Sequence, residues 1–149
     1  MATSDTVGAS TARANVVVLV GLRIVGAALL LGMAYIHLHL YQAGYYLTAV
    51  GPAFIVNSIL GLLAAIAVLA FPNKMLGIVA ALASLLELGT LLALLISIFD
   101  SLFGYKETLT APLLKTTFAV ESAGVVILAI LAVVAARRYG MWKWLPGRR

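Results

Sequence analysis

Four long apolar runs, separated by short polar segments, account for most of the chain. They extend approximately over residues 16–41, 51–71, 75–99 and 116–136. Because an α-helix rises about 1.5 Å per residue and the hydrocarbon core of a bilayer is roughly 30 Å thick, each run is long enough to cross a membrane. The pattern predicts an all-α membrane protein with four transmembrane helices in an antiparallel bundle.

Prolines and polar segments mark the connections between the runs. Pro52 follows Gly51 at the start of the second run, where a missing backbone N–H is tolerated in the first turn of a helix. Residues 71–74 (FPNK) predict a tight turn that makes the second and third helices antiparallel neighbours. Residues 100–115 form a longer loop, whose leucines and Phe103 predict contact with the membrane or a partner. We expect a flexible N-terminal tail over 1–15, a transmembrane domain over 16–136 and a basic, aromatic cytoplasmic tail over 137–149.

Composition excludes several classes of protein. Hydrophobic residues make up 64% of the chain and charged residues 10%, against roughly 25% charged in an ordinary soluble domain. The absence of cysteine excludes disulfides, thiolate metal sites and thiol catalysis. Neither a GxSxG nucleophile motif nor a phosphate-binding glycine loop occurs. We therefore expect a protein that is not an enzyme and that carries no cofactor.

Lysine and arginine are distributed unequally between the two sides of the predicted bundle. One side collects seven of them and the other two, and the positive-inside rule then places both termini in the cytoplasm of a multi-pass inner (plasma) membrane protein. The seven are Arg13, Lys74, Arg137, Arg138, Lys143, Arg148 and Arg149; the two are Lys106 and Lys115. The outer side receives an aromatic belt of Tyr35, Tyr41, Tyr45, Tyr46, Phe103 and Tyr105.

The C-terminal tail combines cations with tryptophan. The simpler interpretation is that the tail anchors the protein at the anionic inner leaflet. The more specific interpretation is that it docks on a cytoplasmic partner. No nucleic-acid partner is expected, because topology already accounts for the basic residues. The candidate cytoplasmic interface comprises Arg137, Arg138, Trp142, Lys143 and Trp144.

Polar residues inside the apolar runs fall at different predicted depths. His37, Asn57 and Glu121 lie in the outer third of their helices, at similar depth, and Glu87 lies near the membrane centre. We expect Glu121 to stay in contact with outer water, and His39 to be an interfacial residue. Arg23, in the inner third of the first helix, is expected to reach the cytoplasmic headgroups on its long side chain.

Glu87 has the least obvious explanation, because a carboxylate at the centre of a bilayer cannot reach the interface. Ser84 and Thr90 lie three residues to either side of it, near one face of the helix. We expect this polar stripe to face protein, with Glu87 hydrogen-bonded to His37, Asn57 or the two hydroxyls, or paired with a cation on a partner. Structural packing is favoured over a proton or ion relay.

His37 and His39 do not predict a metal or haem site. Residues two apart on a helix point about 200° apart, so the two rings cannot converge on one metal. A bis-histidine haem needs histidines on two helices, and only the first run contains any. We expect no metal.

Small residues spaced four apart occur in several runs and permit close helix packing. They exceed what one bundle uses, which favours contact with a partner. The pairs are Ala28 and Gly32, Gly61 and Ala65, Gly77 and Ala81, and Gly89 and Ala93.

The stretch from Ile36 to Asn57 (IHLHLY…GYY…VGPAFIVN) resembles a pattern in small four-helix inner-membrane proteins of actinobacteria. In size and layout the chain is similar to the accessory membrane subunit of the mycobacterial Mce lipid-import complex. The resemblance implies a stabilising subunit of a permease-containing complex that imports fatty acids or other lipids, with membrane lipids and other membrane subunits as partners. Two alternatives stay open: a small oligomeric proton-coupled transporter using Glu87, and an accessory subunit of a respiratory complex.

Overall fold

The computed structural model describes the backbone of residues 3–140 and the side chains of residues 16–140. Four helices follow one another: α1 (Thr3–Gln42), α2 (Gly51–Ala70), α3 (Asn73–Phe99) and α4 (Leu114–Tyr139). A short 3-10 helix, η1 (Tyr45–Leu47), lies between α1 and α2. All four α-helices contain spans long and apolar enough to cross a membrane. The predicted all-α, four-helix membrane architecture is confirmed.

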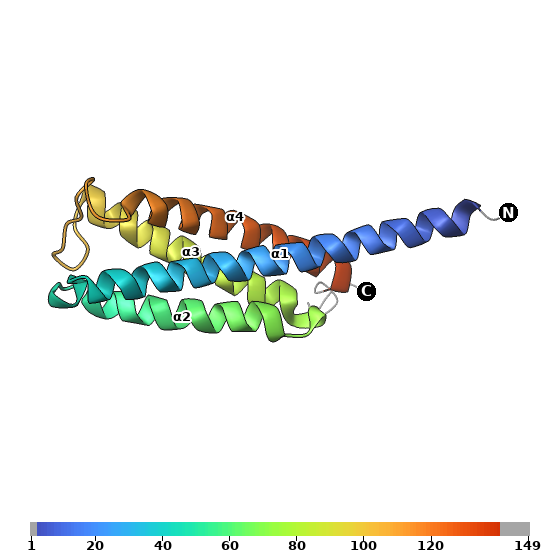
Figure 1. The fold of residues 1–149 in the computed structure, drawn as a ribbon, viewed down its shortest axis with the longest axis horizontal. Helices are drawn as coiled ribbons and strands as arrows, with labels where there is room; N and C mark the ends of the chain where they lie inside the picture. Colours follow the sequence, from blue (N-terminus) through green and yellow to red (C-terminus); the bar gives the residue numbers. More distant parts are fainter. Residues whose placement is uncertain (1–2, 141–149) are drawn as a thin grey trace, which may run out of the picture.

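The helices form an antiparallel bundle of two closely packed pairs, α1 with α2 and α3 with α4 (Figure 1). Helix α4 also packs on α1, which closes the bundle. Helices α2 and α3 are antiparallel neighbours, as the short turn predicts, although they share the fewest contacts of these helix pairs. We call the end with η1 and residues 100–113 the loop end, and the end with the α2–α3 turn the terminal end.

Helix α1 is longer than the sequence predicts. It begins at Thr3, not Val16, and its first turns extend beyond the other helices at the terminal end (Figure 1). Helix α4 is also longer than expected: it begins at Leu114 and ends at Tyr139, and the left-handed backbone conformation of the next residue, Gly140 (φ 71°), stops the helix. The expected tail over 1–15 is therefore helical from Thr3 onward. Of the expected C-terminal tail, residues 141–149 lie outside the described residues.

Buried residues divide the bundle into two halves of different character. From the terminal end to the middle, the core is purely apolar and tightly filled, with Leu30, Met33, Leu76, Leu128 and Leu131 each fully buried. The buried polar side chains of the described residues all lie between the middle of the bundle and its loop end. They are His37, Ser58, Glu87, Thr90, Ser97, Thr117 and Glu121. The polar residues that the sequence sets apart thus gather in one half of the molecule.

The small-residue pairs are used unequally. Gly61 lies so close to α1 that an added Cβ would meet the Leu30 carbonyl oxygen at 3.1 Å, which explains a glycine at this contact. Gly77 is also buried. In contrast, nothing lies within 4 Å of the Cβ position of Gly89, and Ala28 is exposed. The bundle therefore consumes some of these small-residue faces and leaves others on its surface.

Candidate functional site

A cavity with a largely apolar wall and several polar side chains occupies the loop half of the bundle. Its volume is about 70 Å³, and all four helices, η1 and the α3–α4 loop contribute to its wall. At roughly 10–15 Å³ per water-sized probe, this space holds on the order of five water-sized groups. The residues that line it and carry polar or aromatic groups are His37, Tyr45, Phe54, Asn57, Thr90, Ser97, Tyr105, Glu107, Thr117 and Glu121.

His37 and Glu121 are both buried and face each other in the cavity wall. His37 Nδ1 lies 2.9 Å from the Met33 carbonyl oxygen. Since a carbonyl can only accept a hydrogen bond, Nδ1 must carry a hydrogen, and Nε2 is left facing Glu121 Oε1 at 3.7 Å. Two acceptors facing each other repel. The arrangement is favourable when the pair holds one proton between them, on the imidazole or on the carboxyl group.

Glu121 is almost completely buried, with 1% of its surface exposed. The expectation that it stays at the outer surface is wrong, because the loop and the start of α4 extend past it and cover it. Among the described residues, neither of its carboxyl oxygens has a hydrogen-bond partner. Buried polar groups are normally hydrogen-bonded, and leaving one without a hydrogen bond costs free energy. The Glu121 carboxyl group lacks this stabilisation.

Glu87 lies behind the cavity, toward the middle of the bundle, and is fully buried. It fits only because residue 124 on α4 is glycine: an added Cβ there would lie 2.7 Å from the Glu87 carboxyl carbon. Its carboxyl oxygens also lack hydrogen-bond partners among the described residues. A second buried acid without a hydrogen-bond partner therefore lies close to Glu121, on the side toward the middle of the bundle.

The stripe of Ser84, Glu87 and Thr90 faces protein, as predicted, with Glu87 and Thr90 buried and Ser84 half-buried. The expectation that the two hydroxyls bind the Glu87 carboxyl group is wrong. Ser84 donates to the Val125 carbonyl oxygen on α4 at 2.9 Å, and Thr90 donates to the Glu87 backbone carbonyl oxygen at 2.9 Å. Helix carbonyls offer a hydroxyl a nearby acceptor, which leaves the carboxyl group without either donor.

The mouth of the cavity is lined by three half-buried residues, Tyr45, Tyr105 and Glu107, which we call the mouth cluster. Tyr45 donates a hydrogen bond to Glu107 Oε2 at 2.8 Å, and Tyr105 donates one to Oε1 at 3.3 Å. The Glu107 backbone N–H donates to the Ser97 carbonyl oxygen at 2.8 Å, which fixes the loop on α3. Burial, and then the hydrogen bond to Glu107, raise the pKa of Tyr45, and burial raises the pKa of Tyr105. Both phenols therefore stay neutral donors at ordinary pH.

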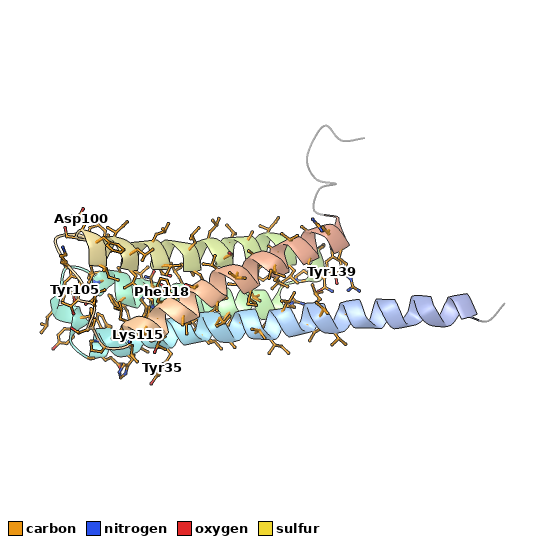
Figure 2. The ribbon with its side chains drawn as sticks, turned by 90° about the horizontal axis from the view of Figure 1, so that it is seen from above. Tyr35, Asp100, Tyr105, Lys115, Phe118 and Tyr139 are labelled. Atoms are coloured by element: carbon orange, nitrogen blue, oxygen red, sulfur yellow. The ribbon has the colours of Figure 1, made fainter. Side chains whose placement is uncertain are left out.

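An aromatic wall connects the mouth with the floor. The Phe54 ring lies 5.2 Å from the His37 ring and 4.8 Å from the Tyr45 ring, and the Tyr45 and Tyr105 rings are 5.9 Å apart. Tyr45 can approach the start of α2 because residue 51 is glycine, whose added Cβ would lie 2.7 Å from the Tyr45 carbonyl oxygen. Figure 2 shows Tyr105 at the same end of the bundle as Asp100 and Tyr35, with Tyr139 at the opposite end.

The structure brings together some of the predicted candidates and separates others. His37, Asn57, Thr90 and Glu121 share the cavity wall, whereas Glu87 and Ser84 lie outside it. His39 is exposed and stacks on Tyr35, with the ring centroids 6.0 Å apart, as an interfacial residue would. In the C-terminal tail, Arg137 and Arg138 are exposed at the end of α4; Trp142, Lys143 and Trp144 lie outside the described residues.

Arg23 contacts the end of the neighbouring helix. Its guanidinium group donates to the Val68 carbonyl oxygen at 2.9 Å, to the Phe71 carbonyl oxygen and to Asn73 Oδ1 at 3.0 Å. The last carbonyls of a helix lack partners within it and carry partial negative charge, so a cation is favourable there. Arg23 thus caps α2 and stabilises the terminal end.

Sequence reasoning missed Tyr45, Phe54, Tyr105, Glu107 and Thr117 as wall residues. The sequence places Tyr45 and Tyr105 in the aromatic belt at the interface, where Tyr35, Tyr46 and Phe103 are exposed, and does not single out Phe54. Glu107 was the available signal, because it is an acid in a loop otherwise rich in leucine and threonine. Within residues 16–140, no three His, Asp or Glu side chains are grouped so as to hold a metal ion.

The chain matches no protein-family model, and no curated protein and no solved structure is significantly similar to it. Fold and site together define a multi-pass, four-helix membrane protein with a buried cavity in one half of the bundle.

Proposed function

We propose that the protein binds a small solute from the loop side of the membrane, in exchange for a proton held by His37 and Glu121. The observation that carries the proposal is the Glu121 carboxyl group, which lies buried in the cavity wall without a hydrogen-bond partner among the described residues, 3.7 Å from His37 Nε2. Unpaired buried acids are rare in structures stabilised only by packing, and inside membranes they mark ion and proton sites.

The groups around Glu121 make it the center of this exchange. His37 faces it from α1, Asn57 lines the same cavity from α2, Thr90 does so from α3, and Glu87 lies behind. Glu107 is the other acid of the wall, at the mouth. Among the described residues, no lysine or arginine lines the cavity. This set of groups stabilises a positive charge and not a negative one. A proton and a cationic solute therefore compete for the same place.

The dense apolar half limits what the chain does alone. Below Glu87 the core is filled by fully buried leucines, Met33 and Val68, and the cavity has no extension toward the terminal end in the part of the chain that the structure describes. The geometry therefore supports binding from one side in this state. Reaction chemistry has no support, because the wall lacks an activated nucleophile, so we propose a protein that is not an enzyme.

Infrared difference spectroscopy tests the proton-binding pair. We expect acid titration of the purified protein to change the carbonyl-stretch bands of its protonated carboxyl groups, and Glu121→Gln to remove one component of that change. Asp100→Asn, which removes an exposed acid at the loop end, serves as the matched control and should leave that component intact. A titration difference spectrum that is the same in Glu121→Gln as in the wild-type protein would refute the proposal.

For the topology, we propose that both termini are cytoplasmic in the inner membrane, on the strength of the basic residues at the terminal end. The chain has no cysteine, so a single introduced cysteine reports its own side. We expect Ser101→Cys to react with an impermeant thiol reagent in intact cells and Lys74→Cys to react only after permeabilisation. The opposite result would invert the orientation.

A second proposal is that the chain acts as an accessory subunit of a larger membrane complex, of the lipid-importing kind that the resemblance implies. The filled apolar half favours this proposal. A subunit that binds a solute from one side only needs a partner to move that solute across the membrane. The exposed Gly89 and Ala28 leave faces for close helix contact. Purification of the tagged chain in mild detergent should recover permease-like subunits; recovery of the chain alone would overturn this proposal.

A further inference from the structure

The aromatic wall and the two carboxyl groups suggest which class of solute the cavity takes. A cation with dispersed charge is attracted to aromatic faces, and aromatic residues beside a carboxylate recognise alkylated ammonium groups. Here Phe54, Tyr45 and Tyr105 form a continuous set of rings with centroids 4.8 and 5.9 Å apart. Glu121 lies at one end of this set and Glu107 at the other.

An inorganic cation fits this wall poorly. A sodium or potassium ion needs several oxygen ligands to replace its hydration shell, and a transition metal needs at least three suitable side chains. The described part of the chain groups no three such side chains. Much of the remaining wall is apolar, including Leu40, Val50, Ala53 and Leu94. Methyl groups suit such a surface, and hydrated ions do not.

We propose that the cavity binds a small alkylated ammonium ion, with Glu121 as its counter-ion and the rings of Phe54, Tyr45 and Tyr105 against its alkyl groups. Tetramethylammonium has five heavy atoms, which agrees with a cavity of about 70 Å³ that holds on the order of five water-sized groups. The ion replaces the proton of the His37–Glu121 pair, so one positive charge is present in either state. This inference rests on the proposed function and adds the class of solute.

Calorimetry on the purified full-length protein tests the proposal with tetramethylammonium as the probe and tert-butanol as a neutral molecule of the same size. We expect tetramethylammonium to bind at least about tenfold more tightly than tert-butanol or sodium, and to release protons into weakly buffered solution. Equal binding of the two organic probes would show that charge plays no part. Binding of sodium alone, or of no probe, would equally overturn the proposal.

Two substitutions separate the contributions of charge and aromatic ring. Glu121→Gln should weaken tetramethylammonium binding about tenfold or more and abolish proton release, and Phe54→Leu should weaken binding while proton release at saturation persists. Asp100→Asn and Tyr46→Leu, an exposed acid and an exposed ring at the same end, are the matched controls. Unchanged binding in both Glu121→Gln and Phe54→Leu would contradict the assignment.

The wild-type comparison of charged and neutral probes decides the question even where a variant fails to fold. A further readout uses Ser97→Cys, whose side chain lies in the cavity wall: tetramethylammonium should slow its reaction with a thiol reagent, and tert-butanol should not. If the infrared difference spectrum depends on Glu121 but tetramethylammonium neither binds nor protects Ser97→Cys, the proton-binding pair stands and the ammonium assignment fails. If the spectrum is also the same in Glu121→Gln as in the wild-type protein, both proposals fail.

Discussion

Tyr45 and Glu107, 62 positions apart in sequence, are joined by a 2.8 Å hydrogen bond that connects η1 to the α3–α4 loop over the cavity mouth. The bond joins the two helix pairs at the loop end, because η1 belongs to the α1–α2 pair and the loop to the α3–α4 pair. Both residues line the mouth of the cavity whose wall contains Glu121.

Removal of this bond should open the cavity. Hydrogen bonds to charged groups contribute about 1.5–3 kcal/mol, so Tyr45→Phe should raise the population of the open mouth about tenfold or more. The rate at which Ser97→Cys reacts with a small water-soluble thiol reagent measures this population. Ser101→Cys, on the exposed side of the loop, should react at the same rate with and without Tyr45→Phe. An unchanged rate at Ser97→Cys would show that the mouth cluster is not a barrier.

The same tyrosine makes stability depend on alkaline pH. The pKa of Tyr45 is raised above its ordinary value of 10.0 in the folded state, so the unfolded chain loses this proton first. The stabilisation is complete below about pH 10 and is lost as the pH rises above that value toward the folded pKa. Thermal unfolding followed by circular dichroism at pH 9 and pH 11 should show a smaller loss of Tm in Tyr45→Phe than in the wild-type chain. Equal losses would contradict this linkage.

Gly124 should not tolerate a methyl group. An added Cβ would lie 2.7 Å from the Glu87 carboxyl carbon, so Gly124→Ala should destabilise the protein by about 1–3 kcal/mol. Gly89→Ala is the matched control: its Cβ position is open, and alanine in a helix should be neutral or stabilising by about 0.5–1 kcal/mol. The double variant Gly124→Ala with Glu87→Ala should recover part of the loss. Additive effects would mean that the two residues do not share this space.

The buried acids should reduce stability. An unpaired buried polar group costs about 1–3 kcal/mol, and an apolar residue of similar shape removes that cost. Glu87→Leu should therefore raise the Tm measured in detergent, while Ser84→Ala, which loses a satisfied hydrogen bond to Val125, should lower it. A lower Tm for Glu87→Leu would identify Glu87 as a stabilising residue with a partner that the bundle itself supplies.

Arg23, in the middle of α1, should stabilise the protein through its contacts with the end of α2. Loss of its hydrogen bonds to the end of α2 in Arg23→Met should cost about 1.5–3 kcal/mol, because a charged donor is removed from otherwise unpaired carbonyls. Lys74→Met removes an exposed cation from the neighbouring turn and should have little effect on unfolding. Similar effects of the two substitutions would show that Arg23 contributes only a positive charge at the membrane surface and not a specific contact with α2.

The sequence by itself determined the four membrane-spanning helices, their antiparallel order and the shared depth of His37, Asn57 and Glu121. These features follow from local physics: run length against bilayer thickness, proline and glycine at turns, and the count of residues along each helix. It also indicated that the stripe around Glu87 faces protein, since hydrocarbon penalises a polar face.

Only the tertiary structure decided which of these residues meet. The rotation of each helix about its axis depends on packing, and packing turned Glu121 onto His37, placed Glu87 against Gly124 and directed Arg23 to the end of α2. Contacts such as Tyr45 with Glu107 join segments far apart in the chain, and no local pattern encodes that distance. The individual polar residues are therefore visible in the sequence, whereas the cavity exists only in the folded bundle.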